Sequence, residues 1–312
     1  MAIRGQYVLS VVVGTLNRLD RLRCCIESIV QNTSVPTRVY VTDAGSTDGT
    51  AEYLRGIEAD NIRVTLRGKK LGQAKAYNEI FADIRTPYTC WLSDDNIVVN
   101  GGLDKAVGIL NAMPSVGMVG LKVKDVEGPF SAEPYIGGIS ETGVLNVNQG
   151  VLRTELLNGL GGFSEEFRDY GIDPDLTARV LYAGHDIVYT RVIAILHYRD
   201  WGKDEALCEQ HDKQKKYKAL YRMKYLYAGQ RAYPHPVVAH LVRGVRRLLS
   251  ISARLIGSTA LDRMARDCYN IVLARHISVM DPIRCFGKDY HLRQHCDRKT
   301  ADSYTSRFRQ KE

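Results

Sequence analysis

The sequence has no apolar run of the roughly 20 residues that a membrane-spanning helix requires. Residues 1–13 combine a basic residue with a short apolar run. Charged residues follow, however, where a signal peptide would be cleaved, so we expect no signal peptide. We predict a cytoplasmic protein that is either soluble or peripheral at the cytoplasmic face of the membrane.

Cysteine is scarce and has no paired spacing. None of the seven cysteines stands in a Cys-x-x-Cys arrangement, the spacing typical of zinc and redox sites. An odd number of unpaired cysteines favours reduced cytoplasmic thiols over a disulfide framework. Internal repeats and low-complexity tracts are absent too, which argues against a repeat protein or a fibre.

The chain is long enough, at 312 residues with 45% hydrophobic residues, to bury one large core or two modest ones. Its net charge of +8 is uneven. From Lys203 onward there are 23 basic and 11 acidic residues, a balance of +12, and before it 20 and 24, a balance of −4. We therefore predict two regions, an α/β domain over 1–202 and a basic helical region over 203–312.

Runs of β-branched residues alternate with helical periodicity in the first hundred residues. Strands are predicted at 7–13, 38–42, 62–66 and 88–92. The helices between them are expected at 19–29, 50–56 and 74–84. Such alternation is typical of right-handed crossovers and of a mostly parallel sheet flanked by helices, so the fold class is α/β.

Polar residues follow the carboxyl ends of these strands, where ligands bind in parallel sheets. They are Thr15, Asn17, Asp43, Asp94 and Asp95. We expect them to converge on one crevice.

Asp94 and Asp95 are adjacent carboxylates after an apolar strand, and two such charges resist joint ionisation unless a cation accompanies them. Their oxygens suit Mg²⁺ or Mn²⁺, which bind through one or two carboxylates plus substrate phosphates. The alternative is an Asp-rich turn that caps the next element. The position at the end of a strand favours the metal.

The second half is less regular. Residues 116–151 are rich in glycine and strand-like, with irregular loops at 125–138 that we expect to face the acceptor. A helix ending near Ala183 precedes two predicted strands, 187–190 and 193–197. After residue 202 the periodicity is helical throughout.

Four segments carry a family resemblance. They are Ser10–Arg18, Val41–Thr50, Gly72–Asn78 and Asp94–Asn96. Together they resemble the inverting family 2 glycosyltransferases, which have the GT-A fold, and the resemblance covers residues 9–197. The second segment is nearly the Asp-x-x-Ser-x-Asp-Gly-Thr signature of that family. The chain departs at Gly14 and Leu16, where the family often has Pro and Tyr, and at Tyr77, where Arg is common.

The resemblance implies roles for these residues. Thr15, Asn17 and Asp43 would hold the nucleobase of a nucleoside diphosphate-sugar donor. Asp94 would contact the ribose, and Asp95 would ligate a Mn²⁺ or Mg²⁺ ion that bridges the diphosphate and neutralises the leaving group. The remaining donor-binding candidates in these motifs are Arg18, Gly72 and Asn78.

Residues 161–167 and 170–176 resemble the Gly-Gly-Phe block and the Glu-Asp-x-Asp-Leu motif of the family. Asp173 then aligns with the catalytic aspartate, which would take the proton of an acceptor hydroxyl as that oxygen attacks the anomeric carbon opposite the diphosphate. Partial burial should raise its pKa. Asp173 can cap the helix as well, with Pro174 at its first position. Ile172 replaces the acid that usually precedes this aspartate.

His197 ends the last predicted strand of the first region, and many members of the family place a metal-ligating histidine there. A packed histidine is the alternative.

The basic region has its own pattern. Residues 213–261 contain eleven Lys or Arg and no acid. A helix over 237–256 would carry apolar residues on one side and arginines on the other. We expect peripheral membrane contact through 213–256; docking on the catalytic domain is the alternative. Nucleic-acid binding is not expected, because the chain has no recognisable module for it.

We predict an inverting transferase that moves a sugar from a nucleoside diphosphate donor, preferably a UDP-sugar, to a hydroxyl of a glycan or lipid-linked acceptor in polysaccharide or cell-envelope synthesis. The chain has no membrane spans and no Gln-x-x-Arg-Trp motif, which favours addition of single sugars. A sugar nucleotidyltransferase is an alternative, but it would want a basic Gly-rich loop after the first strand. A catalytically silent nucleotide-sugar or membrane-binding protein is the other.

Overall fold

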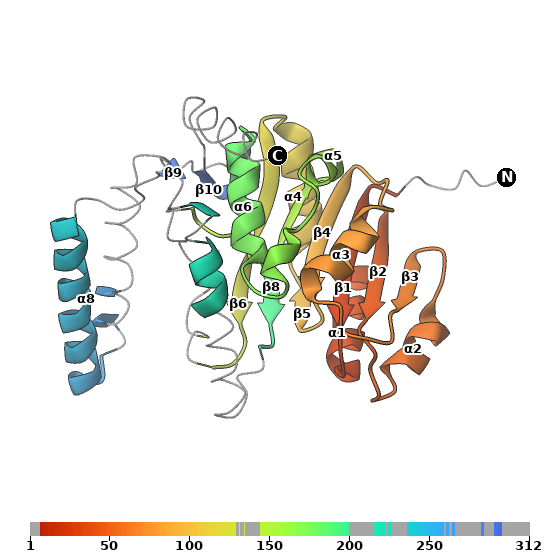
Figure 1. Ribbon diagram of the computed structural model, residues 1–312, viewed down its shortest axis with the longest axis horizontal. Helices are drawn as coiled ribbons and strands as arrows, with labels where there is room; N and C mark the ends of the chain where they lie inside the picture. The colour runs from red at the N-terminus through yellow and green to blue at the C-terminus, as the bar shows by residue number, and fades with distance from the viewer. Residues whose placement is uncertain are drawn as a thin grey trace.

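The structure is a computed structural model that describes residues 7–128, 131, 134, 144–199, 215–221, 224–225, 236–258, 260–261, 264–265, 282–283 and 290–294. Its centre is one ten-stranded sheet, shown in Figure 1. The strand order is β3-β2-β1-β4-β7-β6-β8-β10-β9, and β5 pairs with β8 outside this path.

The first half of the sheet is parallel, as the alternation of strands and helices predicts. Strand β1 (Leu9–Thr15) pairs in parallel with β2 (Thr37–Asp43) and β4 (Tyr88–Ser93), and β2 pairs with β3 (Ile62–Leu66). The helices between these strands are α1 (Leu19–Asn32), α2 (Thr50–Ile57) and α3 (Gln73–Phe81). These elements confirm the strands and helices predicted for the first hundred residues.

The second half is mixed. Strand β7 (Gly150–Arg153) runs antiparallel between β4 and β6 (Val116–Asp125), and β6 pairs in parallel with β8 (Asp186–His197). We predicted two strands over 187–197, but β8 is continuous, and its pairing with β6 shifts register near Gly120 and Lys122.

Three elements between residues 96 and 159 were not predicted. They are β5 (Asn96–Val98), α4 (Gly102–Ala112) and α5 (Thr154–Gly159). β5 is too short for a periodicity of its own. It forms because it pairs antiparallel with the end of β8, with Asn96 opposite His197.

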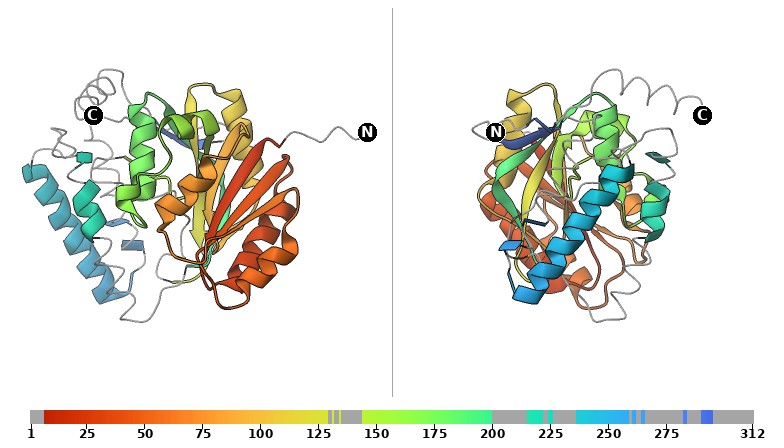
Figure 2. Two further views of the ribbon diagram at one scale, coloured as in Figure 1. Left: turned by 45° about the vertical axis from the view of Figure 1, so that its right-hand side comes forward. Right: turned by 90° about the vertical axis from the view of Figure 1, so that its left-hand side faces the viewer.

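Helices cover both faces of the sheet (Figures 1 and 2). Each face has its own hydrophobic core. Valines of β1 alternate between them, since side chains of a strand point to opposite faces: Val11 and Val13 pack with α1, α2 and α4, and Val12 packs with α3, α5 and α6 (Ile172–Tyr182). Tyr217, Tyr221 and Tyr225 of the C-terminal region belong to the same core as Val12.

The basic region contains the predicted helix, α8 (Pro236–Ile256), at the end of the molecule away from β3 (Figure 1). It also contains two short strands where we expected helices alone, β9 (Pro282–Ile283) and β10 (Tyr290–Gln294), and β10 pairs with β8. The predicted domain boundary at residue 202 lies outside the described residues, as does most of the irregular stretch 129–143.

Candidate active site

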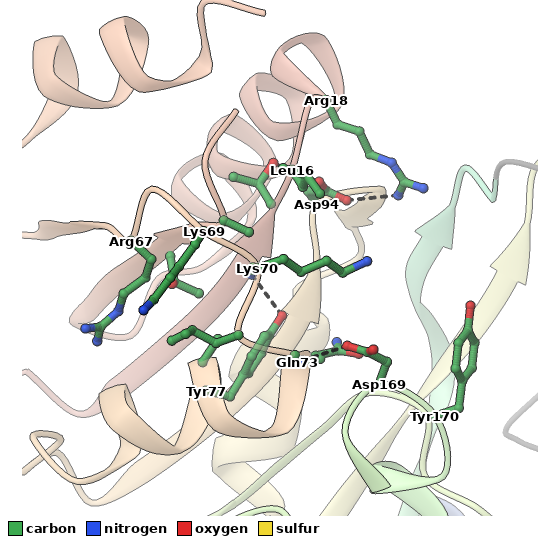
Figure 3. A pocket seen from close by; sticks show the side chains of 17 residues that line it. Leu16, Arg18, Arg67, Lys69, Lys70, Gln73, Tyr77, Asp94, Asp169 and Tyr170 are labelled. Carbon is green, nitrogen blue, oxygen red and sulfur yellow. Dashed lines mark hydrogen bonds and ion pairs between the residues drawn. The ribbon is translucent and has the colours of Figure 1, made fainter. Parts of the chain in front are cut away.

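A pocket of about 360 Å³ opens at the carboxyl ends of β1, β2 and β4 (Figure 3). Several elements far apart in sequence supply its walls. Its lining residues are Gly14, Thr15, Leu16, Arg18, Thr42, Ala44, Arg67, Lys69, Lys70, Leu71, Gly72, Gln73, Ala76, Tyr77, Asp94, Asp169 and Tyr170. Four of the predicted donor-binding residues, Thr15, Arg18, Gly72 and Asp94, are therefore brought together here.

Asp94 is the buried carboxylate of this pocket, with 4% of its surface exposed. Its Oδ2 accepts a hydrogen bond from Thr15 Oγ1 at 2.8 Å, and its Oδ1 lies 3.1 Å from Arg18 Nη1. Burial raises the pKa of Asp94, as does the charge of Asp95, while Arg18 and Thr15 act in the opposite direction.

Arg18 joins the two adjacent aspartates. Its Nη1 lies 3.1 Å from Asp94 Oδ1 and 3.1 Å from Asp95 Oδ2. Two like charges at the end of a buried strand thus have a cation between them, as the sequence requires. A protein side chain supplies that cation in this structure.

Asp95 faces His197 across the β5–β8 pairing. Asp95 Oδ1 lies 3.5 Å from His197 Nε2, and His197 Nδ1 lies 2.9 Å from Asp125 Oδ1. Burial by itself would raise the pKa of Asp95, but the hydrogen bond and charge of His197, with the charge of Arg18, hold it below the ordinary value. Burial lowers the pKa of His197, and Asp95 and Asp125 more than offset this, so that it lies above the ordinary value.

Asp95 and His197 could supply some, but not all, of the ligands that a divalent cation needs. Asp95 offers carboxylate oxygens and His197 an imidazole nitrogen whose ring is oriented by Asp125, the arrangement that metal-binding histidines usually have. Within the described part of the chain no group of three or more His, Cys, Asp or Glu residues could hold a metal ion on its own. An ion at Asp95 and His197 therefore needs oxygens from a ligand, as Mg²⁺ sites at substrate phosphates do.

Asp43 organises the loop after β2. It is 2% exposed, and its carboxylate accepts hydrogen bonds from the backbone N–H groups of Gly45 (3.0 Å) and Ser46 (3.1 Å) and from the hydroxyl of Ser46. These bonds fix the carboxylate against the turn that begins at Ala44. Its neighbours Thr42 and Ala44 line the pocket, but Asp43 itself does not.

Asn17 connects this loop to the loop after β1. It has a positive φ of 52°, its N–H donates to Ser46 Oγ at 2.8 Å, and its Oδ1 accepts from the N–H of Thr47 at 2.8 Å. Asn17 therefore shapes the rim from outside the pocket lining.

The start of α3 forms another wall of the pocket, beside the loops that follow β1 and β2. Gly72 has a φ of +95°, and a Cβ there would lie 2.6 Å from the Arg168 side chain, so glycine is required. Asp169 Oδ1 accepts the N–H of Gln73 at 2.9 Å, and the carbonyl of Arg168 accepts the N–H of Ala74 at 2.7 Å. These bonds satisfy two of the free N–H groups that begin a helix.

Asn78 lies outside the pocket lining. Its Nδ2 donates to the carbonyl of Phe163 at 2.8 Å and its Oδ1 accepts the N–H of Phe163 at 2.7 Å. Here the side chain fastens the Gly-Gly-Phe block to α3.

Asp173 lies in the first turn of α6, partly exposed. Burial raises its pKa to about 6, although Asn146, whose Nδ2 donates to Asp173 Oδ2 at 2.6 Å, acts in the opposite direction. The rise agrees with the sequence prediction. A carboxylate with a pKa near neutrality suits proton abstraction.

The sequence reasoning missed three cations. Arg67, Lys69 and Lys70 line the pocket between β3 and α3. Arg67 Nη2 lies 2.6 Å from Glu79 Oε2. Lys70 points away from Arg67 and Lys69, toward the side of the pocket where Arg18, Asp94 and Asp169 lie (Figure 3). The sequence signal that could have identified them is the presence of three basic residues within positions 67–70, shortly before Gly72.

The chain is similar to proteins of one family. Residues 10–148 match the model described as glycosyl transferase family 2. Over 247 residues the chain is 26% identical to N-acetylglucosaminyl-diphospho-decaprenol L-rhamnosyltransferase of Mycobacterium tuberculosis, covering 64% of this chain and 79% of that protein. Over 206 residues it is 26% identical to the succinoglycan biosynthesis protein ExoA of Rhizobium meliloti, covering 60% and 62%.

Among solved structures, the mannosyltransferase PcManGT of Pyrobaculum calidifontis, in complex with GDP-Man and Mn²⁺, superposes with a TM-score of 0.55 at 18% identity over 87% of each chain. At this identity the likeness concerns the fold.

Proposed function

Since the chain is a family 2 glycosyltransferase with the GT-A fold, we propose that it is an inverting enzyme. It moves one sugar from a nucleoside diphosphate-sugar, with a UDP-sugar favoured, to a hydroxyl of a glycan or lipid-linked acceptor. The observation that carries the proposal is the pair Asp94 and Asp95 beside the pocket, bridged by Arg18 at 3.1 Å on each side.

The donor binds in the pocket at the carboxyl ends of β1, β2 and β4. Asp43 shapes the loop beside the nucleobase, and Thr15 and Asn17 fix the neighbouring loops. Asp94 receives the ribose. Arg18 and Lys70 bring positive charge to the side where the diphosphate lies, which favours binding of the anion.

Asp95 and His197 would hold a divalent cation, and the diphosphate of the donor would complete its ligands. A bound Mn²⁺ or Mg²⁺ supplies positive charge that stabilises the departing nucleoside diphosphate. Asp125 holds the His197 ring so that Nε2 faces Asp95. The Mn²⁺ complex of the structural neighbour supports the use of a divalent cation.

Asp173 is the general base. Its carboxylate takes the proton from the acceptor hydroxyl as the hydroxyl oxygen attacks the anomeric carbon on the face opposite the diphosphate. A pKa of about 6 keeps most of the group ionised at pH 7 and makes it a better base than an ordinary aspartate. Asn146 orients the carboxylate through its bond to Oδ2.

The names of the two relatives, which refer to a diphospho-decaprenol acceptor and to succinoglycan biosynthesis, support a lipid-linked or polysaccharide acceptor. They also support contact with a membrane surface within the predicted segment 213–256. Tyr217, Tyr221 and Tyr225 of that segment are buried in the core, so we propose that α8 (Pro236–Ile256) makes the contact. Within the described residues no helix is long and apolar enough to cross a membrane.

Helix α8 supports this contact. Its apolar side chains at positions that share one face are exposed, from 49% to 81%. They are Leu241, Val245, Leu248, Ile251 and Leu255. Because this face is exposed, we favour its contact with a membrane over its docking on the catalytic domain. Arg246, Arg247 and Arg254 add positive charge that suits the headgroups of anionic lipids.

The proposed function is tested by thermal shift and nucleoside diphosphate release with UDP-, GDP- and dTDP-sugars, in Mn²⁺ or EDTA. We expect one donor to stabilise the protein only with metal, and its slow hydrolysis to be lost in Asp173→Asn. Binding without turnover would favour the catalytically silent protein. Release of pyrophosphate from a sugar phosphate and a nucleoside triphosphate would identify a nucleotidyltransferase instead.

A further inference from the structure

Asp175, two residues after the proposed base, is a fully buried carboxylate with four partners. Its Oδ2 accepts from Ser164 Oγ at 2.5 Å and from Arg179 Nε at 2.8 Å. Its Oδ1 accepts from Tyr225 Oη at 2.5 Å and lies 2.8 Å from Lys224 Nζ. Two of the four partners therefore come from the basic C-terminal region.

Lys224 also contacts the segment 164–167, which precedes α6. Its Nζ donates to Ser164 Oγ at 3.0 Å and to Glu166 Oε1 at 2.9 Å, and it lies 5.4 Å from the centre of the Phe167 ring. One ammonium group thus connects α6 to the segment that precedes it.

Tyrosines of the same C-terminal segment pack where these elements meet. Tyr217 lies 6.4 Å from Phe167 and 6.1 Å from Tyr170, measured between ring centres. Tyr225 stacks on Tyr182 at 6.0 Å. Both tyrosines are buried, so they are part of the core beneath α6.

Charge neutralisation alone does not account for this arrangement. Arg179, one helical turn after Asp175, already pairs with it and also donates to the carbonyls of Leu160 and Gly162 at 2.7 and 2.6 Å. A second cation and a tyrosine hydroxyl on the other oxygen fix the direction of the carboxylate. Asp175 and Asp173 share the first turn of α6, so fixing one backbone position restrains the other.

We propose that Lys224 and Tyr225 are positioning residues for sugar transfer. They hold Asp175, and through it the first turn of α6, so that Asp173 meets the acceptor hydroxyl while Asp169 and Tyr170 stay at the donor pocket. The inference rests on the proposed role of Asp173 as base. By this proposal, Lys224 and Tyr225 of the C-terminal region contribute to catalysis by positioning α6.

The test uses the full chain and four variants. Tyr225→Phe removes the hydroxyl and keeps the ring, Lys224→Met removes the charge, and Lys224→Arg keeps it. Lys218→Met is the matched control, because Lys218 is an exposed lysine of the same segment. Each is assayed for nucleoside diphosphate release, with water and with an N-acetylglucosaminyl-diphospho-prenol as acceptors, and for donor binding by calorimetry.

We expect Tyr225→Phe and Lys224→Met to lower kcat roughly 10- to 100-fold, the effect of displacing a catalytic group by a fraction of an ångström to an ångström. Donor affinity should stay within about twofold. The acidic limb of the rate profile should move to lower pH, since Asp173 would lose part of its burial. Lys224→Arg should recover most of the rate, and Lys218→Met should behave as the native chain.

A lower melting temperature with unchanged kcat and an unchanged acidic limb would overturn the proposal, because the contacts would then stabilise the fold only. Asp173→Asn is assayed alongside. If that variant keeps the native rate, the proposed base is wrong, and this outcome is distinct from a failure of the Lys224 and Tyr225 variants.

Discussion

The hydroxyl of Tyr77 accepts a hydrogen bond from the backbone N–H of Gly14 at 2.8 Å, and it donates one to the carbonyl of Leu92 at 2.7 Å. Gly14 and Tyr77 are two of the positions at which the chain departs from the family pattern. A Cβ on Gly14 would lie 2.8 Å from the Tyr77 ring. The two departures therefore depend on each other: the ring needs a glycine, and the hydroxyl needs the N–H that a proline lacks.

The first prediction concerns this pair. Tyr77→Phe should lower the free energy of unfolding by about 1–3 kcal/mol, because a buried N–H loses its partner. Gly14→Pro should cost at least as much through the lost N–H and the clash. The double variant should cost less than the sum of the two, since both remove the same hydrogen bond. Urea denaturation of the four proteins measures the coupling, and strict additivity would contradict it.

The second prediction concerns the base. Asp173→Asn should lower the transfer rate by about 10²- to 10⁴-fold, because the acceptor hydroxyl loses the group that takes its proton. Donor affinity should remain, since Asp173 does not line the pocket. Steady-state kinetics and calorimetry check both statements. Asp83→Asn, an exposed aspartate on the surface, is the matched control.

The third prediction follows from the pKa of Asp173. With a folded-state pKa of about 6 and a lower value in the unfolded chain, folding favours the protonated acid. The stabilisation is present at pH 4 and is lost as the pH rises through 6. The native rate should fall as the pH drops below 6. Asp173→Asn should raise the melting temperature at pH 8 relative to the native chain, and much less at pH 4.5.

The fourth prediction concerns the metal. Asp95→Asn should remove most of the Mn²⁺-dependent stabilisation by the donor and lower kcat at least about 100-fold. Thermal shift with donor, with and without EDTA, measures the first effect. Equal metal dependence in this variant and in the native chain would exclude Asp95 as a ligand.

The fifth prediction concerns α8. Replacing Leu248 and Leu255 with glutamate should reduce sedimentation with vesicles that contain anionic phospholipid by about tenfold or more, because it removes apolar surface and adds negative charge. Val30→Glu is the control, since Val30 is an exposed apolar residue on α1. Binding to neutral vesicles should be weak for every variant. If the glutamate variants lose a dimer and the native chain does not bind vesicles, the exposed face of α8 instead contacts a second copy of the chain.

The sequence predicted the first half of the fold well because its signals are local. Each strand of the first half is a short apolar run that ends in a polar loop, and this is sufficient to place Thr15 and Asp94 at one edge of the sheet. Asp173 was predicted as the base from a motif, which stays a prediction; the rise of its pKa agrees with the partial burial expected from the sequence.

Contacts between distant segments could not be predicted in this way. Strand β5 has three residues and exists only because β8 pairs with it. The side chain of Asn78 bonds to Phe163, 85 residues away, and Lys224 bonds to Asp175; a single sequence gives no sign of either partner. The basic residues within Arg67–Lys70 are evident in the sequence, but they belong to no motif that would have indicated their place in the pocket.

The pairing of β5 with β8 also sets the order in which the site is completed. Residues 14–94 supply most of the walls of the pocket, whereas Asp173 and His197 lie 158 and 182 residues after Thr15, the end of β1. A chain emerging from the ribosome can therefore assemble much of the pocket before it has either the histidine or the base. The Asp94–Asn96 turn therefore gains its partner strand late, when β8 pairs with β5.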